Sequence, residues 1–374
     1  ELFKTLCDEA GRELPEYFNQ TIEDMYWYIA RAIRPDGHRI LNNDGDRGSD
    51  RAIILSASEK YNHPEWAYLA SNGSQGVKPE EGPSYLIPWA GQLISRSGYD
   101  SMAHWSFFDI GPWGSGHQHN DKLHLSVTAY GKDFLVDAGR YAYTGEVANK
   151  FRPYALSSKG HNLVLIDGKV QKPGPKLAET AVESQAVKIT GDYDFASSSF
   201  GEYFDLEGQA NHNRSLFYVR GEFWVVVDRI STDQPRSIST LWHWHPDAEV
   251  KRIGQSLVGG YDEGSLEVMP VGNAKFDIQM IKGQEEPEIQ GWYSSEYNLY
   301  EPNVASIYTS EIADSSTFVW LLIPTPGNGD RVMTRAKIVG ENEKGITIEV
   351  NRKGAKWELT IPFTDSKNIK FQKR

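Results

Sequence analysis

The sequence predicts a mainly β protein in which an α-helical segment precedes a large antiparallel β-sandwich. Two observations lead to this prediction. Apolar residues recur at helical spacing in the first part of the chain, and from about Trp89 they alternate along short segments bounded by turn residues. We expect no helix between these later segments, which is typical of a sandwich and not of an α/β fold. We therefore predict a helical domain at residues 1–85 and a β domain at residues 86–374.

The helical segment is indicated by a stripe of apolar side chains. Between residues 17 and 33 they recur every three or four positions, which is the spacing of one helix face. The Pro-Asp-Gly run at 35–37 should end this helix, and Asp50 is placed to cap a second helix that runs through Ala57. Residues 73–83, rich in Gly, Pro and Ser, predict a linker.

The β domain is indicated by segments of alternating or continuous apolar residues. Turn residues separate several neighbouring segments, as at Tyr130-Gly131 and Asp167-Gly168. We predict strands at 104–110, 123–129, 133–137, 162–166, 215–219, 223–227, 239–245, 276–281, 304–309, 317–323, 346–350 and 357–361.

The composition excludes several classes of protein. The formal net charge of −12 disfavours a nucleic-acid partner, and it permits a polyanionic ligand only where basic residues gather locally. No apolar stretch is long enough to span a membrane. A single cysteine, Cys7, excludes an internal disulfide. The first residues lack the features of a signal peptide, so we expect the chain to begin inside a domain.

The most informative residues are two histidines, His117 and His119, that follow a loop at 111–116. In an extended segment they share one face, so they can act together or take two roles in one pocket. Asp137 ends a predicted strand and His161 begins another. Imidazole and carboxylate groups are zinc ligands, and three protein ligands with one open position are common. The histidine pair, Asp137 and His161 therefore predict a metal site.

A cupin is the competing interpretation of this region. Gly111, the histidine pair, His124 and Gly131 imitate the first cupin motif, with His124 where a glutamate usually stands. The second cupin motif is missing from the sequence, and the predicted sandwich is larger than a cupin barrel. We therefore disfavour the cupin interpretation.

An ordered set of motifs extends from residue 117 to residue 168. It comprises His-Gln-His-Asn-Asp at 117–121, Val-Asp-Ala-Gly at 136–139 followed by tyrosines, Arg152, two serines at 157–158, and His-Asn-Leu-Val-Leu-Ile-Asp-Gly at 161–168. In this order the motifs resemble the heparinase II/III-like lyases, and the resemblance covers about residues 20–325. Ala138 stands where that family often has proline, which leaves the predicted ligands untouched.

The resemblance implies an α/α toroid followed by an antiparallel β-sandwich, so residues 1–85 would be the end of the toroid. It implies one zinc ion held by His119, Asp137 and His161, and we expect its role to be mainly structural. His117 would belong to the catalytic cleft. Further catalytic residues of the family lie in the toroid, well upstream of His117, so we expect a longer enzyme and little activity from this chain alone.

The implied reaction is β-elimination in a uronate-containing polysaccharide. A base removes the proton at C5 of the uronate, and an acid protonates the leaving O4. The candidates for these roles are His117, Tyr143 and Tyr154. Basic residues near the site are candidates for neutralising sugar carboxylates or sulfates: Arg140 and Arg152, with Lys150 and Lys159 beside them.

A second function remains open from the sequence. It is a non-catalytic carbohydrate-binding sandwich that retains the metal as a structural element. In both cases the expected partner is an acidic polysaccharide or oligosaccharide, met in the periplasm or outside the cell.

Overall fold

The chain forms two compact units in the computed structural model, which describes residues 2–112, 114, 116–327 and 332–374. The helical unit contains the N-terminal segment through Ile40 together with Arg47–Glu81 and Tyr99–Ser101. The β unit contains Leu41–Asp46, Gly82–Gly98 and Met102–Arg374. The short segment Leu41–Asp46 thus belongs to the β unit although helices flank it in sequence. Trp113 and Ser115, from the predicted loop at 111–116, lie outside the described residues.

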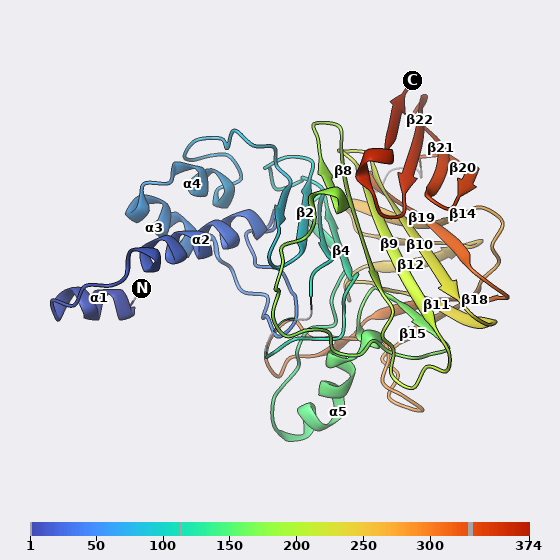
Figure 1. The fold of residues 1–374 in the computed structure, drawn as a ribbon, viewed down its shortest axis with the longest axis horizontal. Coiled ribbons are helices and arrows are strands. Elements are labelled where there is room, and N and C mark those ends of the chain that lie inside the picture. Colours follow the sequence, from blue (N-terminus) through green and yellow to red (C-terminus); the bar gives the residue numbers. More distant parts are fainter. Residues whose placement is uncertain (1, 113, 115, 328–331) are drawn as a thin grey trace. The chain divides into compact units, whose positions relative to one another are not determined.

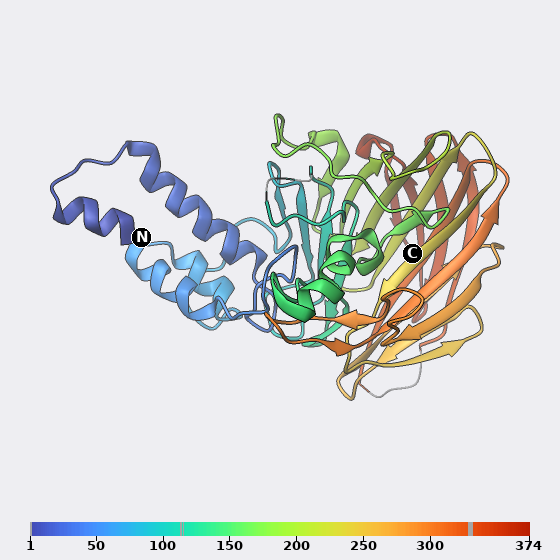
Figure 2. The same cartoon turned by 90° about the horizontal axis from the view of Figure 1, so that it is seen from below.

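The helical unit contains a long helix where the apolar spacing between residues 17 and 33 predicted one. Its helices are α1 Leu2–Glu9, α2 Glu16–Ala32, α3 Arg51–Tyr61 and α4 Pro64–Ala70. Helices α2, α3 and α4 contact one another around the buried Trp66 (Figure 2). Asp50 precedes α3 as predicted, but its carboxylate accepts a hydrogen bond from Arg39 at 2.6 Å. None of the helices described by the structure is long and apolar enough to cross a membrane.

The β unit consists of antiparallel sheets, which confirms the predicted fold class. Each predicted strand overlaps a strand of the structure. The strands are β1 Tyr85–Ile87, β2 Gln92–Arg96, β3 Trp105–Asp109, β4 Leu125–Ala129, β5 Lys132–Leu135, β6 Val164–Ile166, β7 Val187–Ile189, β8 Tyr193–Phe200, β9 Ala210–Val219, β10 Phe223–Thr232, β11 Arg236–His243, β12 Glu249–Ile253, β13 Ser256–Gly260, β14 Gly264–Val271, β15 Asp277–Lys282, β16 Trp292–Tyr293, β17 Glu301–Pro302, β18 Val304–Ile312, β19 Ser316–Pro326, β20 Thr334–Asn342, β21 Gly345–Arg352, β22 Ala355–Pro362 and β23 Lys370–Lys373.

A large central sheet has other sheets packed on both of its faces (Figure 1). Its strand order is β12-β13-β14-β19-β10-β9-β8-β7. Because side chains alternate along a strand, Leu216 and Tyr218 of β9 face one core while Phe217 and Val219 face the other. The first core also holds residues of the sheets β1-β2-β3-β4-β5 and β15-β18-β11-β6, and the second holds those of β20-β21-β22-β23. Burial on both faces explains the nearly continuous apolar runs of β9 and β10.

A helix between strands corrects one prediction. Helix α5, Gly145–Leu156, lies between β5 and β6 in sequence, where we expected no helix. It buries Ala148, Phe151 and Ala155, which recur at helical spacing. Pro153 stands inside this helix, although proline normally disfavours a helix interior. The short helix η1, Ser158–Gly160, then leads to His161; the other short helices are η2 Ser184–Ala186 and η3 Ser366–Asn368.

Candidate metal and catalytic site

Four buried side chains of the β unit form a cluster that can hold a metal ion. Ligand atoms of His119, Asp121, Asp137 and His161 all lie within 4.8 Å of one another. Asp137 lies two residues after β5, and His161 directly follows η1. The structure thus brings together the predicted set of His119, Asp137 and His161 and adds Asp121, the last residue of the motif at 117–121.

Partners outside the cluster hold the outward-facing atoms of its ligands. Nε2 of His119 lies 3.1 Å from Oδ1 of Asp44, and Oδ1 of Asp137 accepts a hydrogen bond from the Gly139 N–H at 2.8 Å. Nε2 of His161 lies 3.0 Å from the carbonyl oxygen of Ala155. Such contacts fix the orientation of a ligand and leave its other atom for an ion.

The remaining atoms of these ligands face one another inside the protein. Nδ1 of His161 lies 3.0 Å from Oδ2 of Asp137. Among the described residues, Nδ1 of His119 and Oδ2 of Asp121 are buried and have no hydrogen-bond partner. Buried polar atoms without a partner are rare and costly, so they indicate a missing ligand. Two imidazole and two carboxylate groups form a donor set that fits zinc.

Electrostatics in the cluster are dominated by buried charges. Burial raises the pKa of Asp137, but His161 outweighs burial and holds that pKa well below its ordinary range. Burial lowers the pKa of His161, but Asp137 outweighs it and raises the pKa to about 9. The pKa of Asp121 is raised, chiefly by burial. A bound cation would compensate this concentration of carboxylates, and it would require both imidazoles to be neutral.

The strands behind the cluster are tied together by Asn162. Its side-chain nitrogen donates to the carbonyl oxygens of Leu125 at 2.8 Å and Val136 at 3.1 Å, and its Oδ1 accepts from the His243 N–H at 2.6 Å. The buried guanidinium of Arg214 donates to the carbonyl oxygen of Asn162 at 2.5 Å. These bonds fix the strand that begins after His161 and therefore the position of that ligand.

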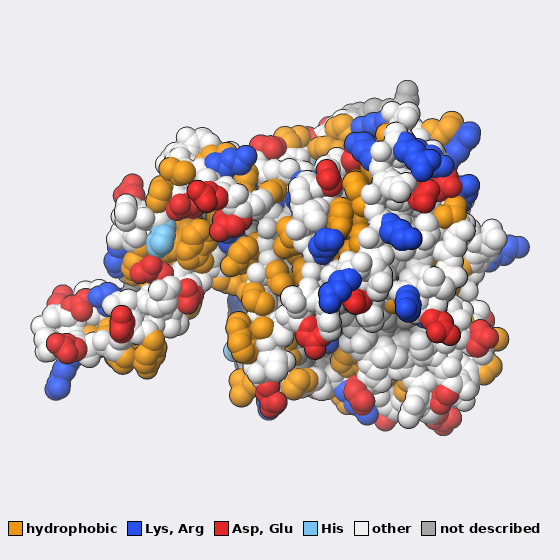
Figure 3. All heavy atoms as spheres, turned by 45° about the horizontal axis from the view of Figure 1, so that its top comes forward, with side chains coloured by type: hydrophobic (Ala, Val, Ile, Leu, Met, Phe, Trp, Pro, Cys, Tyr) orange, Lys and Arg blue, Asp and Glu red, His pale blue; other side chains and the backbone are white. Residues whose placement is uncertain are grey.

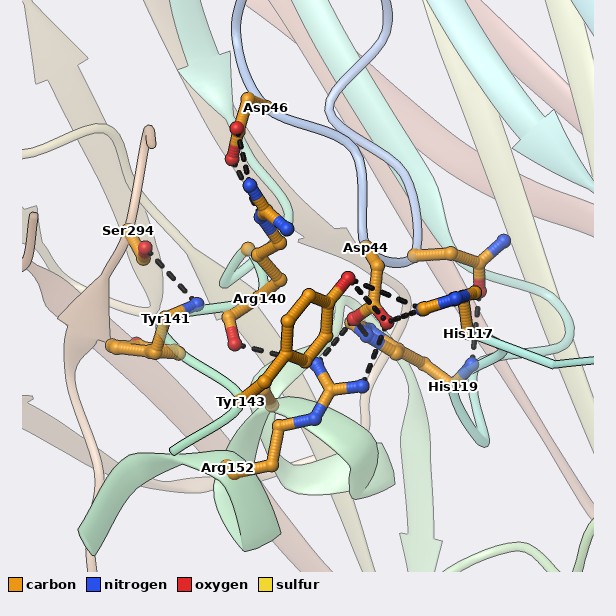
Figure 4. Close-up of polar contacts among 12 residues, drawn as sticks. Asp44, Asp46, His117, His119, Arg140, Tyr141, Tyr143, Arg152 and Ser294 are labelled. Atoms are coloured by element: carbon orange, nitrogen blue, oxygen red, sulfur yellow. Dashed lines mark hydrogen bonds and ion pairs between the residues drawn. The ribbon is translucent and has the colours of Figure 1, made fainter. Parts of the chain in front are cut away.

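A second, more open group of side chains surrounds Asp44 (Figure 4). Nδ1 of His117 lies 2.7 Å from Oδ2 of Asp44, and Tyr143 Oη lies 3.1 Å from the same nitrogen. Both terminal nitrogens of Arg152 donate to Asp44, Nη2 at 2.7 Å. The side chain of His117 is 71% exposed, whereas that of Asp44 is 5% exposed. His117 and Tyr143, two of the predicted catalytic residues, therefore meet at the surface over a buried carboxylate.

Asp44 is held as an anion by its neighbours. Burial raises its pKa, but hydrogen bonds with His119, Arg152 and His117 outweigh burial and hold the pKa well below the ordinary range. The segment that carries it is anchored by its neighbour Asn43, whose side-chain oxygen accepts the His119 N–H at 2.9 Å. Both the backbone and the ring of His119 are therefore bound by the segment Leu41–Asp46.

The predicted basic residues are each paired with a carboxylate. Arg140 binds Asp46 through Nε at 2.7 Å and through Nη2, and its guanidinium lies over the rings of Tyr143, at 5.1 Å, and Tyr297, at 4.9 Å. The other pairs are Arg152 with Asp44, Lys150 with Glu285, and Lys159 with Glu288. On the face drawn in Figure 3, acidic and basic side chains are likewise interspersed. A sugar carboxylate that approaches Arg140 or Arg152 must therefore compete with a carboxylate of the protein.

Tyr154 lies apart from the open group. Its side chain is buried on α5, its hydroxyl donates to Oε1 of Gln290 at 2.9 Å, and burial raises its pKa. Such a hydroxyl is poorly placed to exchange protons with a polysaccharide. Its catalytic role stays a prediction, and its described contacts are those of a side chain packed in the interior.

A cavity of about 720 Å³ borders the buried cluster. His119 and Asp121 line it together with Asp109 and Lys122. Burial and the nearby Asp121 raise the pKa of Asp109. None of the predicted catalytic or substrate-binding residues lines this cavity, so the open group remains the better candidate for a catalytic site.

The sequence did not predict that Asp44 and Asp46 belong to the open group or that Asp121 belongs to the buried cluster. Asp44 and Asp46 lie in the run Asn-Asn-Asp-Gly-Asp at 42–46, whose composition is typical of a turn. Its Asn43 takes a positive φ of 52°. An acidic turn of this kind carries no sign of the partner that it will meet more than 70 residues later, as Asp44 meets His117 across 73 positions.

Comparison with known proteins gives a consistent result. The family profile described as "Heparinase II/III-like, C-terminal" matches residues 91–331. A heparin-sulfate lyase of Bacteroides stercoris is 23% identical over 364 residues, which cover 93% of this chain and 51% of that protein. A heparin-sulfate lyase of Pedobacter heparinus is 22% identical over 353 residues, which cover 91% of this chain and 51% of that protein. The chain spans about half the length of these relatives.

Solved structures of similar fold agree with the sequence relatives. A heparinase III structure superposes with a TM-score of 0.78 at 20% identity and covers 93% of this chain and 53% of its own. A heparan sulfate lyase from Pedobacter heparinus superposes with a TM-score of 0.77 at 18% identity, covering 94% of this chain and 54% of its own. At this level of identity, the structures establish similarity of fold.

Proposed function

Because the chain belongs to the heparinase II/III-like family, which its residues 91–331 match, we propose that it is part of a polysaccharide lyase that cleaves a uronic-acid-containing glycan by β-elimination. The observation that carries this proposal is the pair of His117 and Tyr143. Their polar atoms lie 3.1 Å apart, both side chains are exposed, and two arginines lie beside them. The names of the relatives support an acidic glycan as the substrate.

The two side chains fit the two proton transfers of this reaction. His117 accepts the C5 proton of the uronate, the C5–H electron pair becomes the C4–C5 double bond, and the bond from C4 to O4 breaks. The Tyr143 hydroxyl donates a proton to the leaving O4. Proton transfer by positioned groups of this kind contributes about 10²–10⁴-fold to a rate. After the product leaves, the imidazolium releases its Nε2 proton to solvent and the tyrosinate takes one up, which the exposure of both side chains permits.

Arg140 and Arg152 neutralise the uronate carboxylate in this proposal. Negative charge on that group opposes loss of the C5 proton, and a guanidinium next to it stabilises the charge that develops. Both guanidinium groups are engaged by Asp46 and Asp44, so the substrate carboxylate must share or displace these partners. Each guanidinium has five N–H donors, which permits sharing.

The zinc site complements the catalytic group without entering the chemistry. His119, Asp137 and His161, with Asp121, would hold the ion. When bound, it supplies a fixed positive charge that ties the segment containing His117 to the ends of two strands. We therefore propose a mainly structural role for the ion, with His117 positioned through its neighbour His119.

The test uses a longer protein that includes the upstream region, assayed on a panel of uronate glycans. We expect ultraviolet absorbance to rise as the unsaturated uronate product forms, and we expect His117→Ala to abolish most of this rise while folding is retained. If no glycan of the panel gives the unsaturated product, the proposed function is wrong. Tight binding of a glycan without this absorbance would favour the non-catalytic carbohydrate-binding alternative.

A further inference from the structure

The carboxylate of Asp44 contacts both histidines of the His-Gln-His motif. Its Oδ2 lies 2.7 Å from Nδ1 of His117, and its Oδ1 lies 3.1 Å from Nε2 of His119. The two rings thus present different nitrogens to one buried carboxylate (Figure 4). Neighbouring histidines of one loop therefore share a single acceptor.

We propose that Asp44 is a positioning residue that sets the ring tautomers of both histidines, so that Nε2 of His117 is free for the substrate and Nδ1 of His119 is free for the metal ion. The part that concerns His117 rests on the proposed function. The part that concerns His119 rests on the buried cluster alone and needs no substrate.

The physical basis is that an ionised carboxylate can only accept hydrogen bonds. The ring nitrogen that faces Asp44 must therefore carry the hydrogen: Nδ1 in His117 and Nε2 in His119. A neutral imidazole carries one N–H, so the opposite nitrogen of each ring has a free lone pair. In His119 that nitrogen is the buried Nδ1, which has no hydrogen-bond partner among the described residues. In His117 it is Nε2, on a ring that is 71% exposed.

Arg152 fits this arrangement as the group that fixes Asp44. Both of its terminal nitrogens bind the carboxylate, one to each oxygen, so the carboxylate plane is fixed between the two rings. Such a fork-to-fork pair adds geometric specificity to the charge interaction. Arg152 then acts on the histidines through Asp44, in addition to any contact with sugar.

The same segment contains a matched control. Asp46 lies two residues from Asp44, is also paired with an arginine, and contacts Arg140 and neither of the histidines in the bonds described above. Asp46→Asn therefore removes a similar charge from the same segment and leaves both imidazole contacts intact. A difference between the two variants isolates the effect on the histidines from the effect of local charge.

The first experiment measures zinc affinity of the 374-residue chain by competition with a chromophoric chelator. We expect Asp44→Asn to weaken zinc binding by about 10–100-fold, the usual effect of losing a partner that orients a ligand. Asp46→Asn should stay within about twofold of the unmodified chain, and Asp44→Glu should recover part of the loss, because it keeps the acceptor and the charge. Equal zinc affinity in the unmodified chain and in a folded Asp44→Asn variant would overturn the metal part.

The second experiment reads the tautomers directly, first in the unmodified chain and then in Asp44→Asn. Long-range ¹H–¹⁵N spectra of the chain labelled at histidine distinguish a ring protonated at Nδ1 from one protonated at Nε2. We expect His117 to carry its hydrogen on Nδ1 and His119 on Nε2, and we expect Asp44→Asn to disturb both. A hydrogen on Nε2 of His117 in the unmodified chain would overturn the catalytic part. Neither readout depends on lyase activity, so failure of this inference is distinct from failure of the proposed function.

Discussion

The buried cluster and the open group meet at the His-Gln-His segment, where His119 belongs to the cluster and His117 to the open group. Their side chains are held in different ways. In the buried cluster, Asp137 and His161 are held by backbone groups a few residues away, Gly139 and Ala155. In the open group, His117 is held by a carboxylate from 73 positions upstream. The comparison shows that Asp137 and His161 of the buried cluster depend on backbone groups close to them in sequence, whereas His117, and His119 with it, depend on a distant acidic turn.

The largest expected effect is that of His117→Ala in a longer, active protein, which tests whether the open group takes part in turnover. We expect turnover to fall by about 100-fold or more, because one proton-transfer group is lost. Stability should change by no more than about 0.5 kcal/mol, because the side chain is exposed. Turnover and thermal unfolding are measured on the same preparation. Turnover equal to that of the unmodified enzyme would remove His117 from the mechanism.

His119→Ala should show the opposite profile. The variant loses one buried ligand, so the stabilisation by zinc should disappear, which is about 2.7 kcal/mol when free zinc exceeds its dissociation constant by 100-fold. Calorimetry with and without zinc measures this loss. Protons compete with the ion for imidazole and carboxylate, so zinc should stabilise the unmodified chain less as the pH falls. Full stability of the variant combined with lost turnover would instead assign the ion to catalysis.

A pair of tyrosine variants compares the exposed Tyr143 with the buried Tyr154. Tyr154→Phe should cost about 1 kcal/mol of stability through the lost bond to Gln290 and should leave turnover nearly unchanged. Tyr143→Phe should leave stability nearly unchanged and should lower turnover. Urea unfolding and initial rates are measured for both. If Tyr154→Phe is the variant that loses turnover, the acid/base assignment moves to Tyr154.

The smallest expected effect concerns the acidic turn. Asp46→Asn should free the guanidinium of Arg140 and lower KM for an acidic oligosaccharide by a few-fold at low salt, because surface ion pairs are weak, about 0–1 kcal/mol. The difference should shrink at high salt through screening. Glu285→Gln, which frees Lys150 at the surface, is the matched control. A higher KM for Asp46→Asn would show that Asp46 supports binding and does not compete with it.

The sequence was sufficient to predict features that depend on residues close together in the chain. Alternation predicted the strands, and the ordered motifs predicted that His119, Asp137 and His161 meet. The sequence was insufficient to predict features that arise from tertiary contacts. Asp44 and Asp46 resembled an ordinary turn, and each basic residue appeared free until its carboxylate partner was located in space.

Two misinterpretations have a different physical origin. Pro153 lacks an N–H and usually interrupts helices, yet it lies inside α5, where the apolar spacing is helical. Asp50 stands at the start of α3 as expected, but an arginine side chain competes successfully for its carboxylate. The local rule is outweighed by burial of an apolar face in α5 and by an ion pair with Arg39 at Asp50.

The order of strands in the central sheet has a consequence for synthesis of the protein. Strand β10 pairs on one side with β9, its neighbour in sequence, and on the other with β19, where Trp224 lies opposite Leu322. Ribosomes add about 5–20 residues per second, so the 98 positions between these residues (322 − 224) take roughly 5–20 s to make. During that interval the nascent hairpin of β9 and β10 presents an unpaired, apolar edge, which is a site for aggregation. The topology therefore leaves this edge without its partner strand until synthesis of the chain has passed residue 322.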